Sequence, residues 1–172
     1  MKTLLARAIC LSLLTLGLTQ EARSVVIDPA GDFIPSYVFP KNADLDVVSA
    51  DVLYDKPAGT FTLIGTMNGV INQASSNAYV FGFDRGIGQP LLVNIASNVL
   101  FDSVVILNAD KSGSFTDILG GGAAAQLPSG SVQISGNTIS ATFAASLIPT
   151  LPATGKTPDQ YTWIYGRASP RS

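Results

Sequence analysis

The chain has 172 residues with no His and a single Cys, and 13% of its residues are charged. Without His, neither a Ser-His-Asp or Cys-His catalyst nor a metal site that needs imidazole can be built. One Cys cannot form a disulfide framework, and the length suits one domain with a sizeable hydrophobic core.

The first 24 residues have the pattern of a secretory signal peptide. Lys2 and Arg7 accompany an apolar run over 4–18, and Ala22-Arg23-Ser24 places small residues at −3 and −1 of a cleavage site. This order of basic, apolar and small-x-small parts is typical of such signals, and the run is short for a membrane span. We expect a secreted protein, extracellular or periplasmic, with 25–172 as a single domain and no membrane span after cleavage. A retained N-terminal anchor is the alternative.

Residues 25–172 contain no His, no Cys and no Glu, and their eleven Asp and seven Lys or Arg give a net charge of −4. The cations are dispersed, so we expect no nucleic-acid partner. Strong helix formers such as Glu and Lys are scarce, whereas Gly, Pro, Asn, Ser and Thr are abundant. This composition favours short strands joined by turns.

Alternating or β-branched runs separated by turn signals mark the candidate strands in chain order. They are 24–28, 44–54, 60–67, 78–83, 91–95, 99–107, 114–119, 131–135, 138–143 and 161–166.

Two hairpins stand out among these strands. The turn at 56–59 joins 44–54 to 60–67, and Gly136-Asn137 is a two-residue turn of the kind that needs a positive φ. In 44–54, the face with Val48, Ala50 and Val52 is the more apolar. No amphipathic helix of useful length is present. We therefore predict an all-β fold, an antiparallel β-sandwich of about eight or nine strands, with a closed β-barrel as the alternative.

Four carboxylates flank the Gly- and Pro-containing loop at 30–42, namely those of Asp28, Asp32, Asp44 and Asp46. If the ends of the two flanking strands meet, two to four of these carboxylates gather. Hard oxygen ligands on such a loop suit Ca²⁺, and without a cation the crowding would raise some of their pKa values. The spacing thus suggests a structural calcium site, and solvated turn and cap residues are the alternative interpretation.

The sequence VIDPAGD at 26–32, a Tyr- and Pro-containing loop and DLDVVSADV at 44–52 resemble the opening of extracellular β-sandwich modules of the DOMON-like and family-nine carbohydrate-binding type. The run at 132–143 is similar to their late hairpin, and 161–166 is similar to their closing aromatic strand. The resemblance implies structural calcium at the four Asp residues. It also implies a polysaccharide or cell-surface glycan as partner. Haem, which some relatives bind, lacks its usual His ligand here.

Aromatic side chains offer a candidate surface for a sugar. Tyr161, Trp163 and Tyr165 share one strand face, and Tyr37 lies on the long opening loop. Sugars stack on exposed aromatic rings, but aromatic residues also dominate sandwich interiors. The stripe at 161–165 is therefore a ligand-binding candidate with a core role as the alternative. For the stripe at 79–83, we expect the core.

The remaining charged residues give no strong sign of catalysis. The segment 84–88, with the sequence DRGIG, suits a hairpin turn with an ion pair better than an anion site. Asp102, Asp110 and Asp117 are scattered, and a glycosidase pair among them is a weak third hypothesis. Our first hypothesis is a secreted, non-catalytic binding module, calcium-stabilised and carbohydrate-binding. The alternative is a structural or interaction protein of the cell surface or extracellular matrix with no small ligand.

Overall fold

The structure, a computed structural model, describes residues 22–34 and 37–167. These residues form ten strands: β1 (Ala22–Ile27), β2 (Val47–Asp55), β3 (Thr60–Met67), β4 (Ala78–Asp84), β5 (Ser103–Asn108), β6 (Gly113–Asp117), β7 (Ala125–Gln126), β8 (Val132–Ser135), β9 (Thr138–Ala144) and β10 (Thr162–Arg167). Three short 3-10 helices accompany them: η1 (Ala43–Leu45), η2 (Ala145–Leu147) and η3 (Pro158–Gln160).

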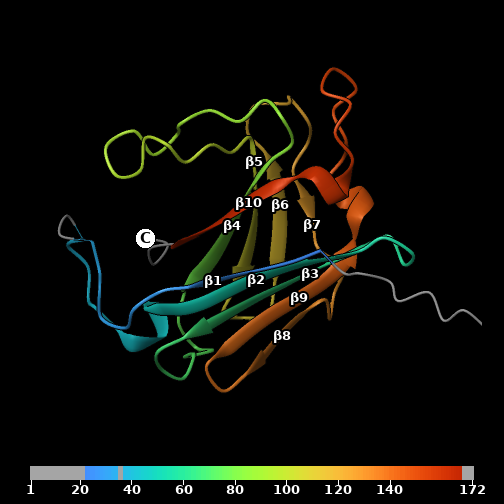
Figure 1. The fold of residues 1–172 in the computed structure, drawn as a ribbon. Coiled ribbons are helices and arrows are strands. Elements are labelled where there is room, and N and C mark those ends of the chain that lie inside the picture. The colour runs from blue at the N-terminus through green and yellow to red at the C-terminus, as the bar shows by residue number, and fades with distance from the viewer. Residues whose placement is uncertain (1–21, 35–36, 168–172) are drawn as a thin grey trace, which may run out of the picture.

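The strands form two antiparallel sheets of five (Figure 1). Sheet A has the order β1-β2-β3-β9-β8 and sheet B the order β10-β4-β5-β6-β7. The sheets pack face to face around one hydrophobic cluster and do not close into a barrel. The predicted all-β sandwich is therefore confirmed.

Local turn chemistry produces the two predicted hairpins. β2 and β3 are joined by a turn that ends on Gly59, with φ +63°, and Asp55 pairs with Thr60. β8 and β9 are joined by Gly136-Asn137, where Gly136 has φ +59° and Ser135 pairs with Thr138. Glycine adopts these positive φ values without steric cost, so both turns fix the register of their strands.

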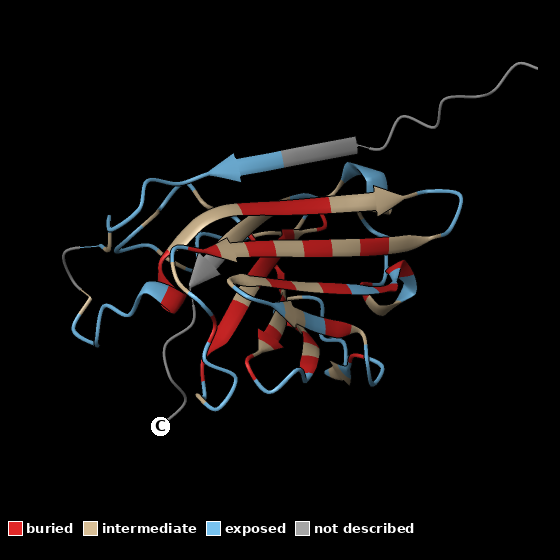
Figure 2. Cartoon of the chain, turned by 90° about the horizontal axis from the view of Figure 1, so that it is seen from below, coloured by how far each residue is buried: buried red, intermediate tan, exposed pale blue. Residues whose placement is uncertain are grey.

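The core lies where the inner faces of the two sheets meet. Phe61 of β3 is at its centre, and its ring centroid is 5.0 to 6.3 Å from those of Tyr54, Phe83, Phe143 and Tyr161. The burial pattern alternates along β3, as Figure 2 shows. Ala50 and Val52 are buried as predicted for their face of β2, and so is the aromatic stripe of β4, which consists of Tyr79, Phe81 and Phe83.

The segment 86–101 differs from the prediction. A strand was expected at 91–95, but the structure has turns there, and the next strand begins at Ser103 rather than near Val99. Pro90 has no amide to donate to a sheet. The amides of Ile95 and Ala96 instead bond back to the carbonyl of Leu92, at 2.9 and 2.7 Å. Apart from an isolated bridge between Gln89 and Phe101, the segment is a long loop.

The predicted signal peptide lies mostly outside the described residues, which begin at Ala22. Its expected end after Ser24 falls inside β1, whose six residues pair with β2 from Ala22↔Tyr54 to Ile27↔Ser49. Among the described residues, the helices are all too short to cross a membrane.

Candidate functional site

A cavity of about 440 Å³ lies against the outer face of sheet B, and its lining is mostly apolar. Cavities of this size hold small organic ligands in many proteins. Its walls come from three parts of the chain: strands β4, β5 and β10, the loop 86–101, and the opening loop with the residues that flank it. Figure 1 shows the loop 86–101, in yellow-green, and the opening loop, in blue, on the same side of the sandwich.

The floor of the cavity consists of outward-facing side chains of sheet B. Val80 and Gly82 of β4, Val104 of β5 and Ile164 of β10 line it, and they alternate along their strands with residues of the core. Gly82 has a specific reason to be glycine. A Cβ atom there would stand 2.8 Å from Cγ1 of Ile164 and 3.2 Å from Cγ of Phe101. The absent side chain thus lets two apolar groups close over the middle of the sheet.

The loop 86–101, which we call the lid, covers this floor. Leu92, Ile95, Ala96, Val99 and Phe101 line the cavity from the lid side. The lid has no charged residue. It also exposes apolar side chains to solvent, with Leu91, Val93, Ile95 and Leu100 between 40% and 60% exposed. Exposed apolar groups gathered beside a cavity are typical of binding surfaces.

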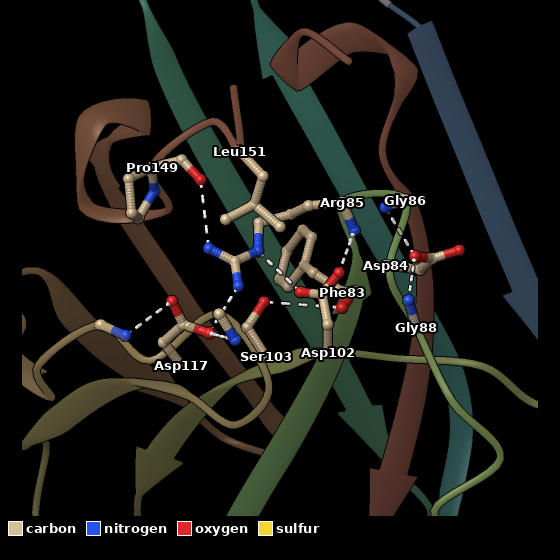
Figure 3. A network of polar contacts seen from close by, with 12 residues as sticks. Phe83, Asp84, Arg85, Gly86, Gly88, Asp102, Ser103, Asp117, Pro149 and Leu151 are labelled. Carbon is tan, nitrogen blue, oxygen red and sulfur yellow. Dashed lines mark hydrogen bonds and ion pairs between the residues drawn. The ribbon is translucent and has the colours of Figure 1, made fainter. Parts of the chain in front are cut away.

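Arg85 and Asp102 hold the two ends of the lid together (Figure 3). The backbone N–H and Nε of Arg85 donate to the two carboxylate oxygens of Asp102, each at 2.6 Å, and both side chains are fully buried. Nη2 of Arg85 donates to Asp117 at 2.6 Å, and Nη1 donates to the carbonyl of Pro149 at 3.1 Å. Charge-assisted bonds of this length are strong and directional, so the guanidinium fixes where the lid leaves and rejoins the sheet.

Asp117 receives further donors, the amides of Gly120 and Gly122 at 2.7 and 3.2 Å. Burial alone would raise its pKa, but the bonds from Arg85 and from these amides outweigh burial, so the pKa of Asp117 lies below its ordinary value. Asp102 and Asp117 therefore do meet, as the weak glycosidase hypothesis requires. Both carboxylates bind a buried guanidinium, however. A general acid needs a raised pKa, so this arrangement argues against a glycosidase pair.

The segment 84–88 is not the expected hairpin turn, because the chain bends at 85–86 and continues into the lid, but the expected ion pair is present and buried. The amides of Gly86 and Gly88 donate to Oδ1 of Asp84, at 2.7 and 2.9 Å, and Arg85 points inward (Figure 3). The protein's own carboxylate thus takes the donors that an anion would have used.

Three of the four predicted metal ligands lie at the cavity. Asp28, Asp32 and Asp46 all line it. Oδ2 of Asp46 accepts bonds from the amide of Gly31 at 2.8 Å and from Nδ2 of Asn68 at 3.0 Å, which ties the opening loop to the start of β2. Burial raises the pKa of Asp28, and the carboxyl groups of Asp32 and Asp46 raise it further.

The fourth predicted ligand, Asp44, is not among the residues that line the cavity. Its Oδ2 accepts from Nδ2 of Asn77 at 2.9 Å and from the amide of Asn72 at 3.3 Å, and its carbonyl accepts from the hydroxyl of Tyr79 at 3.0 Å. Within residues 22–34 and 37–167, no three His, Cys, Asp or Glu side chains group closely enough to hold a metal ion. Of the residues predicted for calcium, three thus line the cavity, and Asp44 instead forms hydrogen bonds with Asn72, Asn77 and Tyr79.

The predicted sugar-stacking residues lie in different places. Tyr161, Trp163 and Tyr165 are half-buried and pack against the core. The Tyr165 ring meets Phe81 edge-on at 4.7 Å, and of these three side chains it alone also lines the cavity. Tyr37 stacks on Phe33 with ring centroids 5.6 Å apart.

The lid residues are the part of the site that the sequence did not predict. Leu92 and Val99 were assigned to strands, because an apolar run alone does not distinguish a paired strand from a loop that covers a cavity. Pro90, within an uncharged stretch, is the signal that argues against a strand there.

Comparisons with protein families, with curated proteins and with solved structures find no match to this chain.

Proposed function

We propose that this protein is a secreted, non-catalytic binding module that holds a small, largely apolar molecule between the lid and the outer face of sheet B. The cavity of about 440 Å³ carries the proposal. Its floor belongs to a rigid sheet, and its cover is a loop that Arg85 and Asp102 anchor at both ends. Sites of this kind, an apolar cavity with a few convergent polar groups, are the usual places for small ligands.

Binding rather than catalysis is favoured by the state of the acidic residues. Asp102 and Asp117 are both buried against Arg85. The carboxylates at the cavity are flanked by apolar side chains, with no His, Cys or Glu among the lining residues. Carbohydrate as the ligand and calcium as a structural ion both stay predictions. A sugar would need the aromatic rings of Phe33, Phe101 or Tyr165, which line the cavity.

The uncharged fluorescent dye N-phenyl-1-naphthylamine tests the proposed cavity. We expect its emission to rise and saturate at one dye per protein, because an apolar, enclosed site removes the dye from water. Ala96→Trp should abolish the signal, since Ala96 lines the cavity and an indole would fill it. Ala144→Trp is the matched control, because Ala144 is exposed at the end of β9. Equal dye binding by both variants would contradict the proposal.

A second candidate function, an interaction protein, is favoured by β1. This strand lies at the edge of sheet A, and its Val25, Val26 and Ile27 side chains are 47%, 47% and 82% exposed (Figure 2). An exposed apolar edge strand is a template for pairing with another chain.

A further inference from the structure

Resting on the proposed function, we infer that the ligand is an organic cation: an apolar body seated under the lid, with an ammonium or similar basic group held by Asp28, Asp32 and Asp46. The ligand binds in the cavity, and these carboxylates make the cavity favour a positively charged ligand.

Among the residues whose side chains the structure describes, those that line the cavity and carry charge are acidic. They are Asp28, Asp32 and Asp46, and the other described lining residues are uncharged. The ion pairs between described side chains involve Asp84, Asp102, Asp117 and Asp159, not these three. Lys41 belongs to the opening loop, where its Nζ lies 5.8 Å from the centroid of the Phe33 ring. The wall thus presents negative charge to whatever enters.

The three carboxylates place like charges beside an apolar wall. Asp46 is only 4% exposed, yet its carboxylate stands among apolar side chains, with the bonds from Gly31 and Asn68 as support. Asp28 and Asp32 are exposed, and burial together with the like charges of Asp32 and Asp46 raises the pKa of Asp28. A positive group beside these carboxylates would offset their mutual repulsion.

The apolar part of the cavity excludes a simple inorganic ion as the full explanation. Leu92, Val99, Val104 and Ile164 lie on the lid and floor and offer no ligand atom for a metal. An alkyl or aromatic body would remove these side chains from water and gain hydrophobic free energy. An anionic lipid or fatty acid would instead meet three carboxylates. A cation with an apolar body matches both halves of the cavity.

Three compounds of equal chain length and different charge test this inference: octylammonium, 1-octanol and octanoate. Titration calorimetry at pH 7, with a chelator to remove divalent metal ions, should rank them in that order. Octylammonium should bind at least about tenfold more tightly than 1-octanol, because partly desolvated ion pairs add to the shared apolar contacts.

The double variant Asp28→Asn/Asp32→Asn should remove the preference for octylammonium over 1-octanol, measured as the ratio of the two affinities for the same protein. Asp55→Asn/Asp159→Asn is the matched control, since it removes the same net charge at positions that do not line the cavity and should keep the preference. Equal binding of octylammonium and 1-octanol, or tighter octanoate binding, would overturn the inference and leave the proposed function standing. If none of the three compounds binds, and the dye does not bind either, the proposed function itself fails.

Discussion

The environment of a single hydroxyl group decides what each tyrosine contributes to this sandwich. Tyr79 is buried and donates to the carbonyl of Asp44 at 3.0 Å. The Tyr161 hydroxyl is also buried, but it has no hydrogen-bond partner among the described residues. Burial raises the pKa of both phenols. A buried hydroxyl without a partner loses its hydration and forms no hydrogen bond in exchange. The hydroxyl of Tyr79 therefore stabilises the fold, whereas that of Tyr161 destabilises it.

Removing each hydroxyl should therefore have opposite effects. Tyr161→Phe should raise the free energy of unfolding by about 1 kcal/mol, and Tyr79→Phe should lower it by about 1 kcal/mol. Urea denaturation of the two variants and the parent measures both values. The two substitutions are each other's control, because each deletes one oxygen from a ring packed in the core. A loss of stability in both would show that Tyr161 has a partner, such as a buried water.

At the scale of an element, the lid depends on one buried guanidinium. Arg85→Met would leave Asp102 and Asp117 buried without their cation, and such breaks cost about 3–5 kcal/mol. The triple variant Arg85→Met/Asp102→Asn/Asp117→Asn should recover most of this loss, because it leaves no charge unpaired. Denaturation at pH 7 compares the three proteins. If Arg85→Met is as stable as the parent, the Arg85–Asp102–Asp117 network contributes little to the free energy of unfolding.

The same network predicts how stability depends on pH. The pKa of Asp117 is lowered on folding, so its contribution is present above the ordinary Asp value of 3.8 and is lost as the pH falls through the lower, folded value. Below the folded pKa, Asp117 is protonated in both the folded and the unfolded protein. The deficit of Arg85→Met relative to the parent should therefore shrink in acid.

The elements also show what sequence can predict and what it cannot. Both hairpins were predictable, because Gly59 and Gly136 act within a few residues of the strands they join. The contacts of Arg85 with Asp102 and Asp117 were not predictable, because these residues lie 17 and 32 positions from Arg85 and nothing in their neighbourhoods marks them as partners. Asp28, Asp32 and Asp46 line one cavity, a placement that the flanking strand ends suggest. Asp44 instead bonds to Asn77, which is 33 residues away.

At the scale of the whole molecule, the exposed apolar side chains are distributed unevenly. Most of the large ones belong to the segments 25–39 and 91–100, and Val70 and Ile118 are the exceptions among the described residues. Both segments border the cavity or lead into its wall. One side of the sandwich is therefore suited to contact with other molecules, through the cavity or through the edge of sheet A.

The edge of sheet A gives a prediction for the assembled state. If β1 pairs with a second chain, the protein should self-associate with increasing concentration, and Ile27→Lys should prevent this, because a charge on an edge strand blocks strand addition. Light scattering coupled to size-exclusion chromatography measures the mass. The control is Val70→Lys, which places the same charge at an exposed residue outside β1. A parent that stays monomeric at every concentration would count against the interaction role.

The contacts at the base of the lid have a consequence for how such a module can change over time. Because the Arg85–Asp102 contact and the Gln89–Phe101 bridge close the loop, residues 90–99 can vary in length and composition with little effect on the two sheets, since lengthening a closed loop adds only a small entropic cost. The lid sequence can then be replaced while the two sheets stay unchanged. A different lid would give the protein a different ligand preference without changes to the sandwich.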